Sequence, residues 1–121
     1  MNNAAEQTQL ESDPEWLAGL ALFNAGHFWH AHEAWETLWL RSAGEQRRFV
    51  QAMIQVAAAL VHWQRGNQRG LQLNWAKART KLAPKSWPGA TINVSQLIIW
   101  MDGMTAATIT TAPQMNTPFL F

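Results

Sequence analysis

The feature that most constrains the fold is an apolar segment at residues 45–65, which contains no Pro or Gly and is followed by Gly66. At about 100° per residue, its apolar side chains cover almost the whole circumference of a helix. These side chains are Phe49, Val50, Met53, Ile54, Val56, Ala57, Leu60, Val61 and Trp63. A helix of this kind is normally buried by its neighbours. We therefore predict that residues 45–65 form the central helix of a bundle.

Four more helices are expected around this central one, at about residues 14–25, 28–41, 68–83 and 94–101. Asp13 and Pro14 mark the start of the first of these helices, and Gly26 and Pro84 mark two of their stops, as Gly66 marks the stop of the central helix. The last of the four is apolar enough for a strand, but no second strand is available to pair with it. The sequence thus predicts an all-α fold, a bundle of about five helices.

The ends of the chain differ in composition from its middle. Residues 1–11 carry few apolar side chains and are expected to be a disordered tail, and residues 103–121, rich in Thr and Pro, an irregular one. Residues 12–102 form the expected helical domain. No signal peptide is visible, and the longest apolar run, residues 56–61, is too short to span a bilayer. Together with the absence of Cys, this favours a cytoplasmic protein that is not in a membrane.

Charge is distributed unevenly along the chain, although the net charge is only +1. All nine Lys and Arg residues lie between Arg41 and Lys85, where Glu45 is the only acid. A basic stretch can bind nucleic acid, but no recognised reading motif accompanies this one. We therefore expect a solvated basic face and no specific nucleic-acid partner.

The helix expected at 28–41 carries the best candidates for chemistry. His32 and Glu36 are spaced i, i+4 and fall at the edge of the apolar arc formed around Phe28, Trp35 and Trp39. Two groups at this spacing can share one metal ion or one substrate atom. Such groups are costly to bury unpaired, so we expect both side chains to be buried and hydrogen-bonded.

A polar stripe on the central helix is the natural partner for these two side chains. It consists of Arg48, Gln51, Gln55 and His62, which fall within a sector of roughly 60°. If the stripe faces the helix at 28–41, it closes a cleft with His32 and Glu36 through Gln55 or His62. If it does not, it is a solvent-exposed strip of the central helix, and both interpretations stay open.

Two segments resemble a known family. Residues 22–39 read LFNAGHFWHAHEAWETLW, and residues 51–62 read QAMIQVAAALVH, followed by Gly66 and Gly70. Both resemble the signatures of the domain of unknown function 309 family, over about residues 14–83. The resemblance implies an all-helical fold. Members of this family are sometimes labelled as predicted metal-dependent hydrolases. The family often has Glu where this chain has His30, so a site that used this Glu would be altered here.

Two functions follow from these residues. In the first, a polar cleft of His32, Glu33, Glu36, Gln51, Gln55 and His62 binds a small molecule or a divalent metal such as zinc, iron or manganese. Metal-assisted hydrolysis would then use His32, Glu36 and His62 as ligands and Glu33 as the base. In the second, the same polar groups form a structural network, and the protein is a scaffold or binding module that binds partners through its basic, Trp-bearing surface.

Overall fold

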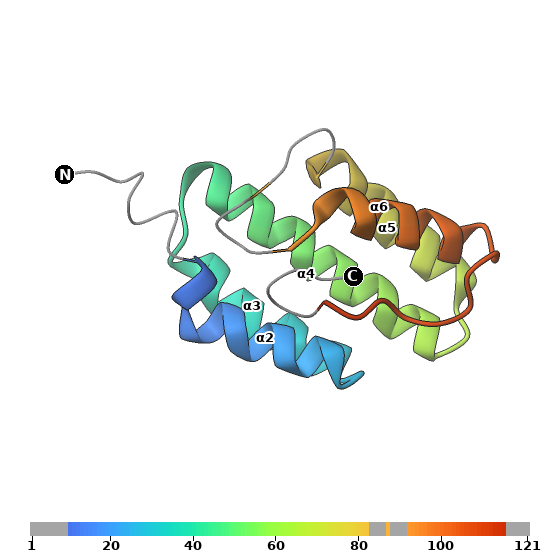
Figure 1. The fold of residues 1–121 in the computed structure, drawn as a ribbon, viewed down its shortest axis with the longest axis horizontal. Helices are drawn as coiled ribbons and strands as arrows, with labels where there is room; N and C mark the ends of the chain where they lie inside the picture. Colours follow the sequence, from blue (N-terminus) through green and yellow to red (C-terminus); the bar gives the residue numbers. More distant parts are fainter. Residues whose placement is uncertain (1–9, 83–86, 88–91, 116–121) are drawn as a thin grey trace.

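A computed structural model describes residues 10–82, 87 and 92–115 of the chain. It contains a short 3-10 helix followed by five α-helices, as drawn in Figure 1. These elements are η1 (Leu10–Ser12), α2 (Pro14–Asn24), α3 (Phe28–Leu40), α4 (Gly44–Gln64), α5 (Gln68–Leu82) and α6 (Val94–Thr105). The described residues contain no strand, so the predicted all-α fold is confirmed. Within the same residues, no helix is both long and apolar enough to cross a membrane.

The helices form two layers with α4 at the centre. In Figure 1, α3, α4 and α5 lie behind, while α2 lies in front of α3 and α6 in front of α5. The longest helix, α4, packs against both α3 and α5, and it buries side chains on most of its circumference. This arrangement confirms the prediction that residues 45–65 form the central helix.

An aromatic cluster joins α2 to α3. The carboxylate of Asp13 caps α2 by accepting hydrogen bonds from the backbone N–H groups of Glu15 and Trp16, at 2.9 and 3.1 Å. The indole of Trp16 stacks on that of Trp35 at a centroid distance of 5.3 Å, and both are fully buried. Gly19 makes this close approach possible, because a Cβ at Gly19 would lie 2.0 Å from Nε1 of Trp35.

The last helix is longer than the sequence predicts. It was expected to end near residue 101, with irregular chain from 103 onward, but α6 continues through Gly103 to Thr105. The side chain of Ile109 folds back into the space that a Cβ at Gly103 would fill. The backbone N–H groups of Thr108 and Ile109 both bond to the carbonyl of Gly103, which ends the helix.

Two segments that were expected to be tails are partly packed on the body. Leu10, which falls in the predicted tail 1–11, lies in η1 and is 1% exposed. Residues 106–115 have no regular secondary structure, but they return to α2, where Asn24 and Met115 exchange two hydrogen bonds (Figure 1). The rest of both predicted tails, at 1–9 and 116–121, lies outside the described residues. So does Lys85, the last residue of the basic stretch.

Candidate functional site

The predicted pair on α3 is only partly buried. The side chain of His32 is 16% exposed and that of Glu36 is 55% exposed, with 3.8 Å between Nδ1 of His32 and Oε1 of Glu36. The ring of His32 lies against the indole of Trp29, with 5.0 Å between the centroids and 9° between the planes. The expectation of burial is therefore wrong for Glu36, because the edge of the apolar arc of α3 is left open to solvent.

The hydrogen bonds predicted between α3 and the polar stripe of α4 are absent from the described residues. Gln55 accepts a hydrogen bond from Nζ of Lys81 on α5, at 2.9 Å. His62 lies 3.2 Å from the side-chain amide of Asn67, and a Cβ at Gly70 would come within 2.4 Å of its ring. Both side chains are thus engaged by α5 or the turn before it, and Nδ1 of His32 is buried without a hydrogen-bond partner there.

The contacts of His62 with α5, instead of with α3, also bear on the predicted metal ligands. Within the described ranges, no group of three or more His, Cys, Asp or Glu side chains could hold a metal ion. His32 and Glu36 alone would supply two donors, fewer than the three or four protein ligands of a zinc site. Glu33, the predicted base, is exposed on the solvent side of α3. The residues present do not fit a metal centre, so no catalytic step is derived through one.

A second polar group near this edge is also without a partner. Nε1 of Trp39 is buried and has no hydrogen-bond partner among the described residues, while the guanidinium of Arg47 lies 3.8 Å from the centre of its ring. Arg47 belongs to α4, so this cation–π contact joins the two helices where the predicted cleft was expected. Gln51, the remaining cleft residue, is half-buried on α4.

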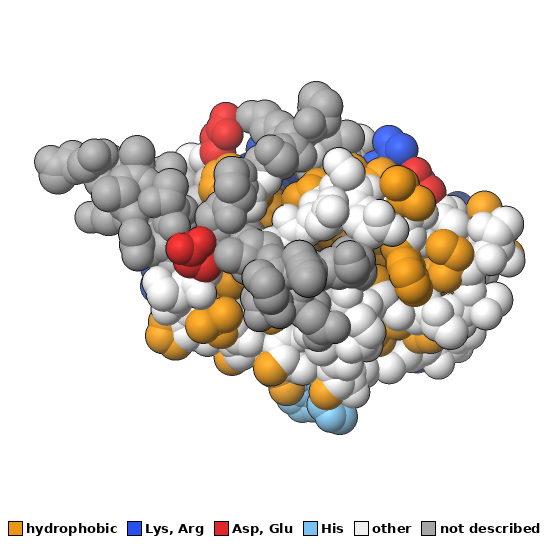
Figure 2. Space-filling model, in the orientation of Figure 1, with side chains coloured by type: hydrophobic (Ala, Val, Ile, Leu, Met, Phe, Trp, Pro, Cys, Tyr) orange, Lys and Arg blue, Asp and Glu red, His pale blue; other side chains and the backbone are white. Residues whose placement is uncertain are grey.

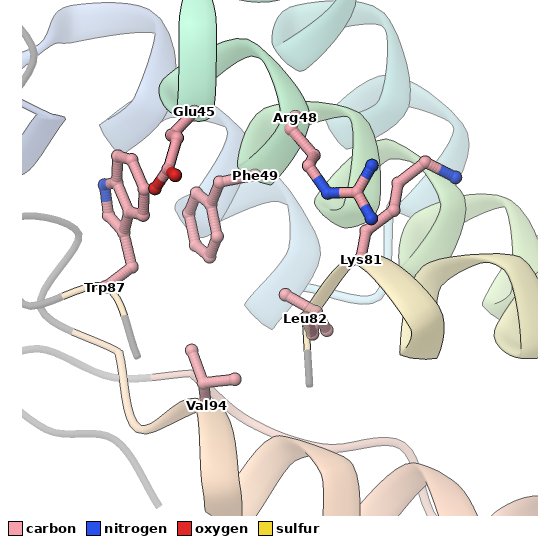
Figure 3. A pocket seen from close by; sticks show the side chains of 7 residues that line it. All are labelled: Glu45, Arg48, Phe49, Lys81, Leu82, Trp87 and Val94. Carbon is pink, nitrogen blue, oxygen red and sulfur yellow. The ribbon is translucent and has the colours of Figure 1, made fainter. Parts of the chain in front are cut away.

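A pocket that the sequence did not predict lies where α4, α5 and the start of α6 meet. Figure 3 shows it, lined by Glu45, Arg48, Phe49, Lys81, Leu82, Trp87 and Val94. The rings of Phe49 and Trp87 stack with 5.1 Å between centroids and 6° between planes. Leu82 and Val94, both buried, supply apolar walls. The pocket therefore combines a flat aromatic wall, an aliphatic wall and charged groups at its rim.

The charged groups of the pocket are arranged asymmetrically. Arg48 and Lys81 lie on one side of Phe49, and Glu45 lies on the other side, next to Trp87 (Figure 3). The ammonium of Lys81 points away from Phe49 and bonds to Gln55, so mainly its aliphatic stem lines the space. Desolvation first, and then the charges of Arg48 and Lys77, lower the pKa of Lys81.

Arg48 is the cation of the pocket that remains available to a ligand. The basic residues Arg41 and Arg79 are held by ion pairs with Asp13, Glu15 and Asp102. In the part of the chain that the structure describes, Arg48 takes part in no ion pair. It is also exposed, so an anion can reach it without displacing a carboxylate.

Sequence reasoning placed Arg48 on the polar stripe but missed the pocket around it. Trp87 lies between α5 and α6, and Val94 begins α6, so neither shares a helical period with α4. The available signal was an aromatic residue, Trp87, in a short connection next to the basic stretch. Periodicity cannot show which helix such a residue covers.

Comparisons with known proteins give one match. No curated protein and no solved structure matches the chain. The domain of unknown function family DUF309 matches residues 16–74, from the first turn of α2 to the middle of α5. The matched segment contains both signatures found in the sequence, so the predicted resemblance to the DUF309 family is confirmed over residues 16–74.

Proposed function

We propose that this protein is a binding module for a small organic anion with a flat apolar body, held in the pocket between α4, α5 and α6. The observation that carries the proposal is the position of Arg48, a cation outside any described ion pair, beside the parallel stack of Phe49 and Trp87. Ligand sites in proteins commonly combine mostly apolar walls with a few polar groups that fix orientation.

The apolar walls favour a planar ligand. An aromatic ring placed against Phe49 or Trp87 gains about 0.5–1.5 kcal/mol from ring geometry beyond the burial of its area. Leu82 and Val94 add aliphatic surface on the side of α5 and α6. Neither provides a side-chain polar atom, so hydrogen bonds to the ligand must come from the rim.

The rim favours a single negative charge at one end of the ligand. The planar guanidinium of Arg48 can form two parallel hydrogen bonds to a carboxylate or sulfonate. Among the described residues, no second cation lies on the opposite side of Phe49, where the pocket is lined by Glu45 and Trp87. The preferred ligand is thus a monoanion whose other end is neutral or donates a hydrogen bond.

The test uses 8-anilinonaphthalene-1-sulfonate, a monoanion with a flat naphthalene ring system, titrated into the folded protein by calorimetry. We expect Arg48→Ala to weaken binding by about tenfold or more, since a hydrogen bond to a charged group contributes about 1.5–3 kcal/mol. Arg65→Ala is the matched control, because Arg65 is also an exposed arginine but follows the end of α4 and does not line the pocket. Equal affinities of the wild type and Arg48→Ala would contradict the proposal.

A further inference from the structure

A second surface is formed by the outer sides of α3, α4 and α5. The helix α4 runs antiparallel to both neighbours, since Gln64 at its end bonds to the carbonyl of Gly26 before α3, at 2.8 Å. Gln55, nearer its start, is bonded to Lys81 near the end of α5. The helices α3 and α5 are therefore parallel to each other and flank α4. We call this surface the three-helix face.

Exposed apolar side chains lie on both edges of the three-helix face. On α3, Trp29 and Leu40 are 52% and 70% exposed, and they share one side of the helix with Glu36. On α5, Leu73 is 50% exposed and shares a side with Lys77. Between the edges, Ile54 and other half-buried residues of α4 form the middle, which carries Arg47 two turns before Ile54.

The two edges carry opposite charges. The edge on α3 contains Glu33 and Glu36, and the edge on α5 contains Lys77 and Lys81. In the described residues, none of the four forms an ion pair with a group of opposite charge on another helix. By contrast, Figure 2 shows that few charged side chains lie on the side of the molecule that carries α6. The three-helix face is thus bipolar across its width.

The opposite charges also lie at the same level along α4. Gly26 lies at the same height along the axis of α4 as Gln64. Glu36 comes ten residues after Gly26, and Ile54 comes ten residues before Gln64, so Glu36 and Ile54 also lie at one height. His62 packs on Gly70, so these two residues lie at one height along α4. Lys77 comes seven residues after Gly70, and Gln55 comes seven residues before His62, so Lys77 and Gln55 also lie at one height. Ile54 and Gln55 are neighbours, and the acid and the lysine therefore face each other across the width of the surface.

We propose that the three-helix face is the interface of a symmetric homodimer, in which α3 of each copy lies against α5 of the other. A two-fold axis parallel to α4 brings Glu36 to the partner's Lys77 and Trp29 to the partner's Leu73. The other two-fold axis in the plane of the face, perpendicular to α4, would place each charged edge against the same edge of the partner. Like charges would then meet, which is unfavourable. Interfaces of this kind are self-complementary, and the bipolar face meets that requirement.

Trp29 is the expected centre of binding energy in this dimer. Its ring already lies on His32, so little side-chain freedom is lost when a second copy covers it. Tryptophan is among the residue types enriched where protein interfaces gain most of their binding energy. The charged pairs then determine which orientation the two copies adopt.

The test is the mass in solution, measured by sedimentation velocity over a range of micromolar concentrations. The wild type is expected to sediment as a dimer of two 13.7 kDa chains. Trp29→Glu is expected to be a monomer, and circular dichroism would verify that it remains helical. Ile99→Glu is the control, because Ile99 is 61% exposed on α6, away from the three-helix face, and this variant should remain a dimer.

Charge reversal separates the proposed axis from other arrangements. Glu36→Lys and Lys77→Glu should each weaken the dimer about tenfold or more, and the double variant should recover most of the loss. A monomeric wild type, a dimeric Trp29→Glu, or a double variant weaker than both single ones would each overturn the proposal. Loss of the dimer in Ile99→Glu would also overturn it, by placing the interface on α6.

Discussion

Two aromatic clusters meet at Phe49, and they differ in how far they are closed. On one side, Phe49 lies 5.7 Å from Trp16, which belongs to the buried cluster with Phe23 and Trp35. On the other side, it stacks on Trp87, which is half-buried. In the first cluster, Nε1 of Trp35 donates a hydrogen bond to the carbonyl of Trp16. The second opens into the pocket.

The comparison teaches that the same residue type serves two purposes here. Aromatic rings sealed between α2, α3 and α4 contribute mainly to the free energy of folding, because their whole area is removed from water. The ring of Trp87 is held by one stack and retains area for a ligand. Substitutions in the closed cluster should therefore affect stability, and substitutions in the open cluster should affect binding.

The largest effect is expected at Gly19. In Gly19→Ala, the new methyl group would lie where Nε1 of Trp35 now is, and the fully buried indole has no free space to enter. We expect the free energy of unfolding to fall by about 3 kcal/mol. Urea denaturation would measure it, with Ala21→Ser on the exposed side of α2 as the control. A loss below about 0.5 kcal/mol would show that the cluster is loosely packed.

A smaller effect on stability, with a larger one on binding, is expected for Trp87→Ala. The variant loses one stack on Phe49 and part of a half-buried side chain, which should cost about 1–2 kcal/mol. Its affinity for the sulfonate probe should nevertheless fall about tenfold, because the ligand loses a flat wall. Denaturation and calorimetry on the same sample compare the two quantities. Unchanged affinity would make Trp87 a purely structural residue.

The smallest effect on stability is expected for the contact that holds α6 to α5 beside the open cluster. Asp102 accepts hydrogen bonds from Arg79 and from Nε1 of Trp75, at 2.9 and 2.8 Å. The Arg79 bond, ahead of the Trp75 bond, lowers the pKa of Asp102 below its ordinary value of 3.8. A carboxylate with a lowered pKa stabilises the fold above pH 3.8, and this stabilisation is lost as the pH falls through the lowered pKa.

Asp102→Asn should test this contact without breaking the bond to Trp75, since the amide oxygen can still accept it. Because the pair is more than a third exposed, we expect a loss of no more than about 1 kcal/mol at neutral pH. The difference from the wild type should disappear in melts near pH 2. A difference that persists at that pH would mean that Asp102 acts through packing and not through its charge.

The fold was largely predictable because its signals are local. Asp13 and Pro14 begin α2 as expected, and Gly26 and Gly66, with φ of 83° and 73°, follow the ends of α2 and α4. The all-round apolar pattern of residues 45–65 identified α4 as central. The end of α6 was missed because Gly103 is helical, and Ile109, six residues further on, packs where a side chain at 103 would lie.

The site was less predictable, because a helical period shows which residues share a side but not which neighbour that side faces. Gln55 and His62 do lie on one stripe, yet Lys81 and the bare backbone at Gly70 bring both to α5. The pairing with His32 was therefore wrong. The pocket depends on Trp87 meeting Phe49, a long-range contact for which the sequence carries no period.

The most direct test of the contrast between the clusters is an indole N–H spectrum of the ¹⁵N-labelled protein, titrated with 8-anilinonaphthalene-1-sulfonate. The eight tryptophans each contribute one indole N–H signal, and Trp87→Phe and Trp35→Phe assign the two that are compared. The account predicts that the Trp87 signal shifts in a saturable manner, while the signal of Trp35 in the closed cluster does not move. A shift of Trp35 with no change at Trp87 would contradict it.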